Sequence, residues 1–229
     1  MEKIKATVTE IKKHCHDTIS LFIKPQTKIT FKPGQFVMAA VPFKDTFLRR
    51  AYSVANIDSD LLELCLNHVE GGIASTYLCN LNVGDTIEID GPWGVFTLKE
   101  GPVDQLFIGT GTGISALRPM IHTLLKTNHK QQITLIFGER SEEELFFRKE
   151  FEALEKEHNN FIYVPVLSRK NPSWQGQTGY VQHVMKNYIN NGNKLNVYIC
   201  GLKAMITDVQ NDLLSLGVDK KSIYTERYD

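Results

Sequence analysis

The sequence predicts a two-domain protein: an N-terminal six-stranded antiparallel β-barrel, then an α/β doubly wound parallel sheet of five strands in the order 3-2-1-4-5. Two observations predict this fold class. As far as Leu98, short alternating strands are separated by turn signals, which is typical of a small barrel. Beyond a linker at residues 99–104, strands alternate with helical segments, which is typical of a parallel sheet. The 229 residues allow two domains, residues 1–100 and residues 101–229, each with its own core.

The first half contains six strand-like runs and one helical piece. Pro33-Gly34 and Gly71-Gly72 mark turns between runs, because glycine and proline favour turn conformations. The helical piece runs from Ile73 to Leu81 and is ended by Gly84. The expected strands cover residues 4–11, 18–25, 34–42, 49–56, 61–69 and 85–98.

The second half alternates between buried-type strands and helices. A first helix ends at Leu125, and a charged helix is expected over residues 141–158, where Ser141 caps an acidic first turn. Two further helices are expected over residues 180–189 and 203–216. The expected strands cover residues 105–110, 133–138, 161–168, 196–201 and 222–228.

Charge and composition exclude several classes of protein. Lysine and arginine together number 26, as do aspartate and glutamate, so no basic surplus indicates a nucleic-acid partner. The N-terminus lacks the apolar core of a signal peptide, and no apolar run approaches the roughly 20 residues that span a membrane. We therefore expect a cytoplasmic protein with no membrane partner. The sequence leaves the oligomeric state open.

The four cysteines, Cys15, Cys65, Cys79 and Cys200, are scattered and include no C-x-x-C pair. This spacing argues against a local zinc or iron–sulfur motif and against a disulfide framework, and three of the four are interpreted as buried core residues. The segment 14–17 (His-Cys-His-Asp) consists of residue types that bind metals, but the sequence contains no second pair of ligands at the spacing of a known metal motif. We interpret it as a strand end or turn, and we expect no metal site.

A glycine-rich loop, Gly109 to Gly113, lies between an apolar strand and a helix. Glycines let the backbone approach a ligand closely, and the helix N-terminus offers free N–H groups, so the loop is a candidate dinucleotide site. Its spacing is not G-x-G-x-x-G, and no P-loop lysine follows. The alternative is a strand–helix turn without a ligand. In the predicted strand order, Cys200 and Gly201 lie at the same crevice, although Cys200 could equally be a small core residue.

The strand at residues 48–56 carries an unusual combination of side chains. Arg50 and Tyr52 are two residues apart, so they share one face and offer a cation and an aromatic surface to one ligand. Ser53 points to the other side, where its backbone and hydroxyl could reach a ring edge. Further on, residues 71–76 begin a helix whose N–H groups could hold a phosphate. Taken singly, Tyr52 could be core, Arg50 a solvated edge residue, and Ser75 or Thr76 a helix cap.

Six segments in order resemble motifs of the ferredoxin–NADP⁺ reductase superfamily. Arg50-Ala51-Tyr52-Ser53 matches its R-x-Y-[ST] signature, and residues 109–113 resemble its G-T-G-T-G-I-A-P loop, although Ser115-Ala116 replaces the usual Ala-Pro. The remaining four similar segments are residues 72–76, the G-P-x-G-x-F run at 91–96, the C-G motif at 198–201, and an E-x-[YF] pattern at 226–228.

The resemblance implies a flavin-binding barrel at residues 1–100 and an NAD(P)-binding domain at residues 101–229, with hydride passing between the two ligands. It implies an NAD(P)H-dependent flavoprotein reductase that contains FAD, with FMN as the less favoured flavin. Electrons would then pass to a separate ferredoxin, flavodoxin or oxygenase component. Because no cysteine set for a 2Fe–2S cluster is present, any iron–sulfur partner must be another chain.

The resemblance also implies roles for individual residues. Arg50 would pair with the flavin phosphate, Tyr52 would pack on the isoalloxazine and Ser53 would lie near N5. Cys200 would lie beside the nicotinamide C4, and Tyr228 would cover the opposite flavin face. The implied catalytic residues are Ser53, Cys200, Glu226 and Tyr228. The implied cofactor-binding residues are Arg50, Ala51, Tyr52, Ser53, Asn67, Val69, Gly72, Ile73, Ala74, Ser75, Thr110, Gly111, Thr112, Gly113, Ser168, Arg169, Tyr180, Cys200, Gly201 and Tyr228.

The choice between NADH and NADPH depends on two segments. Ser168, Arg169 and Tyr180 resemble the 2′-phosphate and adenine contacts of NADPH-specific relatives, whereas Glu139, in the segment 137–141, would lie near the ribose and suit NADH. The sequence leaves this choice open. Two other functions also stay open: a free flavin reductase, and a non-catalytic regulatory subunit that binds a dinucleotide or a flavin.

Overall fold

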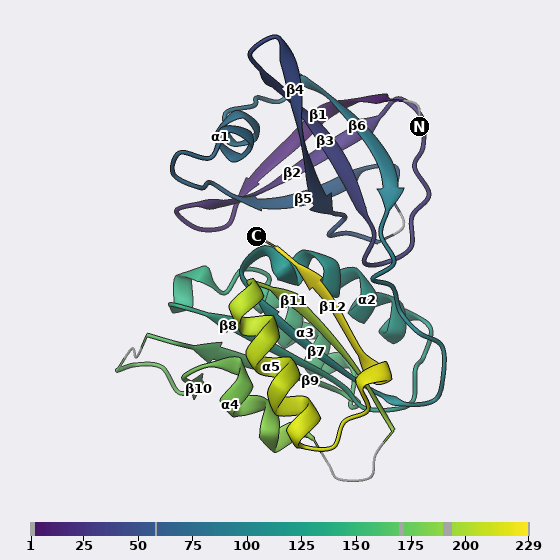
Figure 1. Ribbon diagram of the computed structural model, residues 1–229, viewed down its shortest axis with the longest axis vertical. Helices are drawn as coiled ribbons and strands as arrows, with labels where there is room; N and C mark the ends of the chain where they lie inside the picture. The colour runs from purple at the N-terminus through teal and green to yellow at the C-terminus, as the bar shows by residue number, and fades with distance from the viewer. Residues whose placement is uncertain (1–2, 58, 170–171, 190–193, 229) are drawn as a thin grey trace. The chain divides into compact units, whose positions relative to one another are not determined.

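The computed structural model describes residues 3–57, 59–169, 172–189 and 194–228. The chain forms two compact units (Figure 1). The first contains residues 1–98 together with residues 118–123, and the second contains residues 99–117 and 124–229. No helix among the described residues is long and apolar enough to cross a membrane.

The first unit is an antiparallel sheet with the strand order β4-β3-β6-β1-β2-β5. Its edges meet at one antiparallel bridge between Val54 and Leu64, so the sheet closes into the expected barrel. Alternate residues, among them Val8, Leu21 and Ile89, point into a shared apolar core. The elements are β1 (Ile4–Lys13), β2 (Thr18–Pro25), β3 (Phe36–Phe43), β4 (Thr46–Ser53), β5 (Leu62–Asn67), α1 (Ile73–Cys79) and β6 (Thr86–Trp93).

The second unit is a parallel sheet with the order β10-β9-β8-β7-β11-β12. Five of its strands follow the predicted order 3-2-1-4-5. The sixth, β10 (Gln177–Thr178), is a two-residue addition at the edge that is too short to produce a strand pattern in the sequence. The other strands are β7 (Asp104–Thr110), β8 (Ile133–Glu139), β9 (Phe161–Leu167), β11 (Leu195–Gly201) and β12 (Ile223–Arg227).

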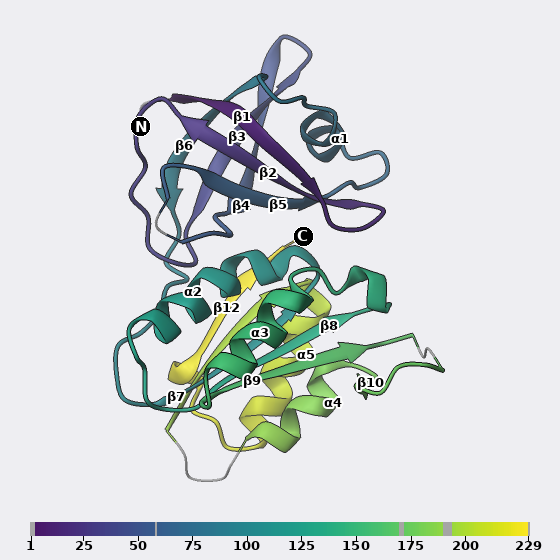
Figure 2. The ribbon, with the colours of Figure 1, turned by 180° about the vertical axis from the view of Figure 1, so that it is seen from behind.

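Helices cover both faces of this sheet. Figure 2 shows α3 on the face turned to the viewer, whereas α4 and α5 lie on the face that Figure 1 shows. The sheet is therefore doubly wound, as the sequence predicts. The helices are α2 (Ile114–Lys126), α3 (Arg148–Glu157), α4 (Val181–Met185) and α5 (Lys203–Ser215), with 3₁₀ turns at Gly111–Gly113, Glu142–Glu144, Lys186–Tyr188 and Lys220–Ser222.

The expectation of one charged helix over residues 141–158 is wrong. Phe147 adopts a left-handed conformation with φ of 63°, which interrupts helical hydrogen bonding before α3. Ser141 is the N-cap of the 3₁₀ turn and forms a capping box with Glu144, whose Oε2 accepts from the Ser141 backbone N–H at 2.9 Å, so the expected cap belongs to this turn and not to a longer helix. Likewise, the helix expected over residues 180–189 is divided into α4 and a 3₁₀ turn.

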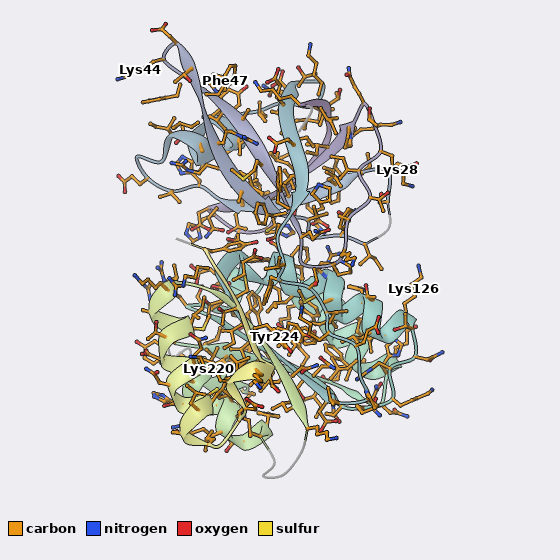
Figure 3. The ribbon with its side chains drawn as sticks, turned by 45° about the vertical axis from the view of Figure 1, so that its right-hand side comes forward. Lys28, Lys44, Phe47, Lys126, Lys220 and Tyr224 are labelled. Atoms are coloured by element: carbon orange, nitrogen blue, oxygen red, sulfur yellow. The ribbon has the colours of Figure 1, made fainter. Side chains whose placement is uncertain are left out.

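Three aromatic rings stack across β7, β11 and the edge strand β12 of the parallel sheet. Tyr198 lies between Phe107 and Tyr224, with both ring centroids 5.1 Å away. Lys99 caps the stack with its ammonium group 5.5 Å from the Tyr224 ring, which Figure 3 labels. The Lys99 backbone N–H also donates to the Tyr198 hydroxyl at 2.8 Å, so this stack fixes the start of the second unit against its central strands.

Candidate functional site

The two arginines of β4 have different surroundings. Arg49 pairs with Asp90, a carboxylate that is 6% exposed and also accepts from Trp93 Nε1 at 2.7 Å. Arg50 points to the opposite face and forms no ion pair with any residue in the described part of the chain; it donates only to the carbonyl of Arg49 at 3.0 Å. Arg50 is therefore exposed and available to an anionic ligand.

Tyr52 lies on the same face of β4 as Arg50, half-buried against the barrel core. Burial raises the pKa of Tyr52 to about 12, and the nearby Cys79 adds to this effect while Arg50 opposes it. The phenol is therefore neutral at physiological pH and offers an uncharged aromatic surface. Ser53 follows at the end of β4 and is 3% exposed.

The turn before α1 combines a glycine in a left-handed conformation with a hydrogen-bonded serine. Gly71 has φ of +72°, which a residue with a side chain would rarely adopt. The Ser75 hydroxyl accepts from the Val69 N–H at 3.1 Å, so it closes the turn. The candidate phosphate donors here are then the first backbone N–H groups of the helix rather than this hydroxyl. Val69 and Ile73 flank the turn with exposed apolar side chains.

The glycine loop of the second unit is held against β11. A Cβ on Gly113 would collide with the carbonyl oxygen of Cys200 and would lie 2.6 Å from its carbonyl carbon. Gly111 has φ of +56°, and open space surrounds the position of its missing Cβ. Gly113 therefore allows the loop backbone to pack directly on the backbone of β11, and Gly111 allows the left-handed turn.

Cys200 lies between two strand neighbours at the carboxyl edge of the sheet. It pairs with Gly109 on β7 and with Glu226 on β12. The side chain is fully buried, and burial raises the pKa of the Cys200 thiol well above its usual value, with a further contribution from the negative charge of Glu226. Cys200 is therefore a neutral thiol at physiological pH.

The turn after β11 completes the surroundings of the loop. Gly201 has φ of +151°, and a Cβ there would collide with Thr110 Oγ1. The backbone N–H of Tyr228 donates to the carbonyl of Gly201 at 3.0 Å, which brings the C-terminal segment to the same edge. The second unit thus brings Cys200 and Gly201 to the glycine loop, as the sequence predicts, and it also brings Glu226 and Tyr228 to the same edge of the sheet.

Two hydroxyls test whether this edge suits a polar ligand. Thr110 Oγ1 and Ser115 Oγ are both buried, and neither has a hydrogen-bond partner among the described residues. Buried polar groups without partners are uncommon in native proteins. Beside a backbone cradle that only glycine allows, such groups fit a ligand rich in hydrogen-bonding atoms, such as a dinucleotide. Ser115 is not among the residues that the sequence suggests.

A second cluster of the same unit lies at the ends of β8 and β9. The N–H of Ser168 donates to the carbonyl of Glu139 at 2.9 Å, and the N–H of Arg169 donates to the carbonyl of Arg140 at 3.0 Å. The two arginines are thus neighbours, both exposed, with no ion pair in the described part of the chain. Arg140 was not selected from the sequence, because its proximity to Arg169 depends on the pairing of two loops.

Tyr180 lies near the same strand ends. Val181, which follows it and begins α4, packs so closely on the end of β8 that a Cβ on Gly138 would lie 2.5 Å from its side chain. Tyr180 itself is 60% exposed and contacts the ring of His183 edge-on. An aromatic surface and two guanidinium groups therefore flank the carboxyl ends of β8 and β9.

Glu139 ends β8, and its backbone carbonyl belongs to the same cluster. Its carboxylate is close enough to Tyr163 to contribute to a raised pKa of that phenol, whose main cause is burial. Tyr163 lies on β9 and packs against Phe151 of α3, with ring centroids 5.3 Å apart. Glu139 lies on the same face of the sheet as Tyr163, since it is four residues beyond Leu135, which pairs with Tyr163.

The chain matches two family models that together cover most of its length. Residues 5–98 match the oxidoreductase FAD-binding domain, and residues 107–211 match the oxidoreductase NAD-binding domain. The chain is also 38% identical to ferredoxin–NADP reductase B of Sorangium cellulosum over 209 residues, which cover 87% of this chain and 86% of that protein. The chain belongs to the ferredoxin–NADP⁺ reductase superfamily. This reductase is thus an NAD(P)H-dependent flavoprotein oxidoreductase with FAD as its flavin.

Other relatives of this superfamily reductase are larger. The reductase component of phenol 2-monooxygenase from a Pseudomonas species is 36% identical over 217 residues, but the chain covers only 60% of that protein. Among solved structures, a ferredoxin NADP⁺ reductase from Neisseria gonorrhoeae with bound FAD and NADP has a TM-score of 0.87 at 25% identity, with 99% of each chain covered. The FAD/NAD-binding domain of a Vibrio cholerae nitric oxide dioxygenase shares the fold, with a TM-score of 0.89 at 23% identity and 98% of each chain covered.

Proposed function

We propose that this reductase takes electrons from NADPH and delivers them to a separate one-electron carrier protein, such as a ferredoxin or flavodoxin, or to an oxygenase component. The observation that carries this proposal is a candidate half-site on each unit: Arg50 and Tyr52 on β4, and the glycine cradle around Thr110. The relatives include a ferredoxin–NADP reductase and an oxygenase reductase component, which supports a protein as the acceptor.

Each half-site performs one physical task in this proposal. FAD, when bound, accepts a hydride equivalent and releases the electrons singly. Arg50 neutralises the flavin phosphate, and Tyr52 supplies an uncharged surface for the ring. The cradle of Gly113 and Gly201 lets the dinucleotide lie directly on backbone, where the Thr110 hydroxyl acquires a partner. Cys200 stays protonated and therefore introduces no charge beside the nicotinamide.

Replacing Ser53 or Cys200 with alanine is expected to slow flavin reduction by about 10-fold and to change nucleotide binding much less, because both residues are proposed to orient reacting atoms rather than to hold the nucleotide. Anaerobic stopped-flow absorbance at several NADPH concentrations separates the rate of reduction from the dissociation constant. Cys65→Ala, at a buried thiol of the barrel, is the matched control. Unchanged reduction rates in both variants would remove Ser53 and Cys200 from the reacting centre.

A preference for NADPH is supported by the neighbouring Arg140 and Arg169. An adenosine 2′-phosphate carries negative charge, and guanidinium groups bind phosphate with charge-assisted hydrogen bonds. Ser168 adds a hydroxyl, and Tyr180 adds an exposed ring for the adenine.

Arg169→Ala and Arg140→Ala are each expected to raise the KM for NADPH by about 10-fold, while the KM for NADH changes less than about twofold, because only NADPH carries the phosphate. Lys220→Ala removes an exposed cation from the opposite edge of the sheet and serves as the control (Figure 3). Steady-state kinetics with both nucleotides measure the ratio of the KM for NADPH to the KM for NADH in each variant. An equal effect on NADPH and NADH would reject the assignment of the phosphate site.

The acceptor is tested with the purified, FAD-loaded protein. NADPH oxidation should be slow alone and should accelerate saturably when a ferredoxin or flavodoxin is added, with cytochrome c as the terminal acceptor. If free FAD, FMN or riboflavin instead gives the higher saturable rate, the protein is a free flavin reductase. If bound flavin is never reduced by either nucleotide, a regulatory binding subunit replaces the proposed enzyme.

A further inference from the structure

The turn between β1 and β2 brings three different metal-ligating groups together. Sγ of Cys15, the imidazole of His16 and the carboxylate of Asp17 lie within 4.8 Å of one another. They form the one such group of three found among the described residues. The sequence argued against a metal here because no second ligand pair follows, but in the structure a single turn supplies all three groups.

Two distances within this turn, which run to different oxygens of the Asp17 carboxylate, are close to the spacing between ligands of a tetrahedral ion. Cys15 Sγ lies 3.2 Å from Asp17 Oδ1, and His16 Nε2 lies 3.5 Å from Asp17 Oδ2. Zinc bonds of about 2.0–2.3 Å at tetrahedral angles separate neighbouring ligand atoms by about 3.3–3.5 Å. The 71% exposed His16 side chain is free of packing that would prevent the small rotation needed to bring its nitrogen toward the thiol.

The backbone of the turn is fixed before any ion binds. The N–H of His14 donates to the carbonyl of Thr18 at 2.9 Å, which closes the hairpin. The N–H of His68 donates to the carbonyl of Asp17 at 2.6 Å, and the Thr18 hydroxyl lies 2.8 Å from Asn67 Oδ1. The loop is thus held from the end of β5 as well, so ligand placement does not depend on ordering a flexible segment.

The neighbouring polar side chains His14 and Thr18 have other hydrogen-bond partners, and neither competes with the three proposed ligands for the ion. Nε2 of His14 is 2.8 Å from Ser20 Oγ, which donates to the buried Glu63 at 2.7 Å. His14 therefore bonds to the buried polar groups of the barrel, although the sequence places it beside His16. The Thr18 hydroxyl, 3.0 Å from Asp17 Oδ1, orients the carboxylate as an outer partner of a ligand would.

We propose that Cys15, His16 and Asp17 bind one divalent transition-metal ion of the zinc type, with water as the fourth ligand. A thiolate and an imidazole favour zinc or cobalt over magnesium and calcium, which prefer oxygen ligands. In the absence of metal, the Cys15 thiol donates its hydrogen to Asp17. Metal binding therefore replaces that hydrogen with the ion and releases a proton to solvent.

Cobalt(II) is the probe that tests this site. FAD-loaded, tag-free protein is treated with a chelator, dialysed and titrated with CoCl₂. We expect one Co²⁺ per chain, with tetrahedral d–d absorption to the red of the flavin bands and loss of that absorption when ZnCl₂ is added. A weakly buffered titration should also show release of about one proton per ion. Absence of tetrahedral absorption, or an affinity no different from that of the variants below, overturns the proposal.

The variants identify the ligands. Cys15→Ser and Asp17→Asn should each weaken Co²⁺ binding by at least about 10-fold, since loss of even an outer partner of a ligand costs that much. Cys79→Ser, at the other half-buried thiol, and His158→Ala are controls that should bind Co²⁺ normally. Flavin absorption and circular dichroism confirm that each variant is folded. Loss of the absorption in Cys79→Ser with retention in Cys15→Ser would also overturn the assignment.

Discussion

Replacing Gly113 with alanine is expected to lower NADPH-dependent flavin reduction on the order of 100-fold, because a displacement of about 1 Å at a positioning loop costs this much. The new methyl group would collide with the Cys200 carbonyl and lie 2.9 Å from the backbone nitrogen of Gly201. These atoms belong to a central strand and its turn, so they cannot move aside as a flexible side chain would. We also expect a loss of about 1–3 kcal/mol in the free energy of unfolding, as for other overpacked sites.

Gly111→Asn is the matched variant of the same loop. Gly111 needs a left-handed backbone but has no atom within 4 Å of the missing Cβ, and asparagine tolerates that conformation. Its unfolding free energy should therefore fall by less than that of Gly113→Ala. Denaturant unfolding and anaerobic stopped-flow reduction measure the two effects. If Gly113→Ala unfolds and reacts like the wild type, backbone contact between the loop and β11 is not required.

Arg50→Ala is expected to weaken FAD binding by about 10- to 100-fold, which corresponds to the loss of hydrogen bonds to a charged group worth about 1.5–3 kcal/mol. Arg50 has no ion pair to lose within the described part of the chain, so the unfolding free energy of the FAD-free protein should barely change. Fluorescence titration of the FAD-free protein with FAD measures the dissociation constant. The dissociation constant of Arg50→Lys for FAD should lie between those of the wild type and Arg50→Ala, since lysine keeps the charge but not the forked geometry of arginine.

Arg49→Ala is expected to have the opposite effect, on stability rather than on FAD affinity. It leaves the buried Asp90 with Trp93 as its remaining side-chain partner, so we expect about 1–3 kcal/mol of lost stability and little change in FAD affinity. Both measurements require FAD-free protein, because bound ligand itself raises the apparent stability. If Arg49→Ala weakens FAD binding as much as Arg50→Ala does, the two faces of β4 do not have the separate roles proposed here.

The barrel strands were predictable because alternation of apolar and polar residues is a local pattern. The parallel sheet was predictable because its strands are short, nearly continuous apolar runs with helices returning regularly between them. The interruption of the charged helix was not predictable, since residues 142–157 have helical composition throughout and no local pattern shows that Phe147 adopts a left-handed conformation. There the apolar side chains of Phe146 and Phe151 are buried, and this tertiary packing overrides helix propensity.

The burial of the cysteines was only partly predictable. Three were expected in the core, but Cys65 and Cys200 are buried while Cys15 and Cys79 are half-buried. Composition gives the usual location of a cysteine, not the depth of a particular one. The turn that leaves Cys15 half-buried also places it beside His16 and Asp17. The spacing rules for metal motifs describe pairs of ligands and do not cover three consecutive residues.

The sequence by itself determined the order of strands and helices, the glycine loop at the end of β7, and the shared face of Arg50 and Tyr52. These follow from local periodicity and from conformations that only glycine permits. The tertiary structure alone decided which arginine pairs with Asp90, that Arg140 lies beside Arg169, and that Gly113 contacts the backbone of Cys200. Each of these depends on strands that are distant in sequence, whose pairing register no local pattern specifies.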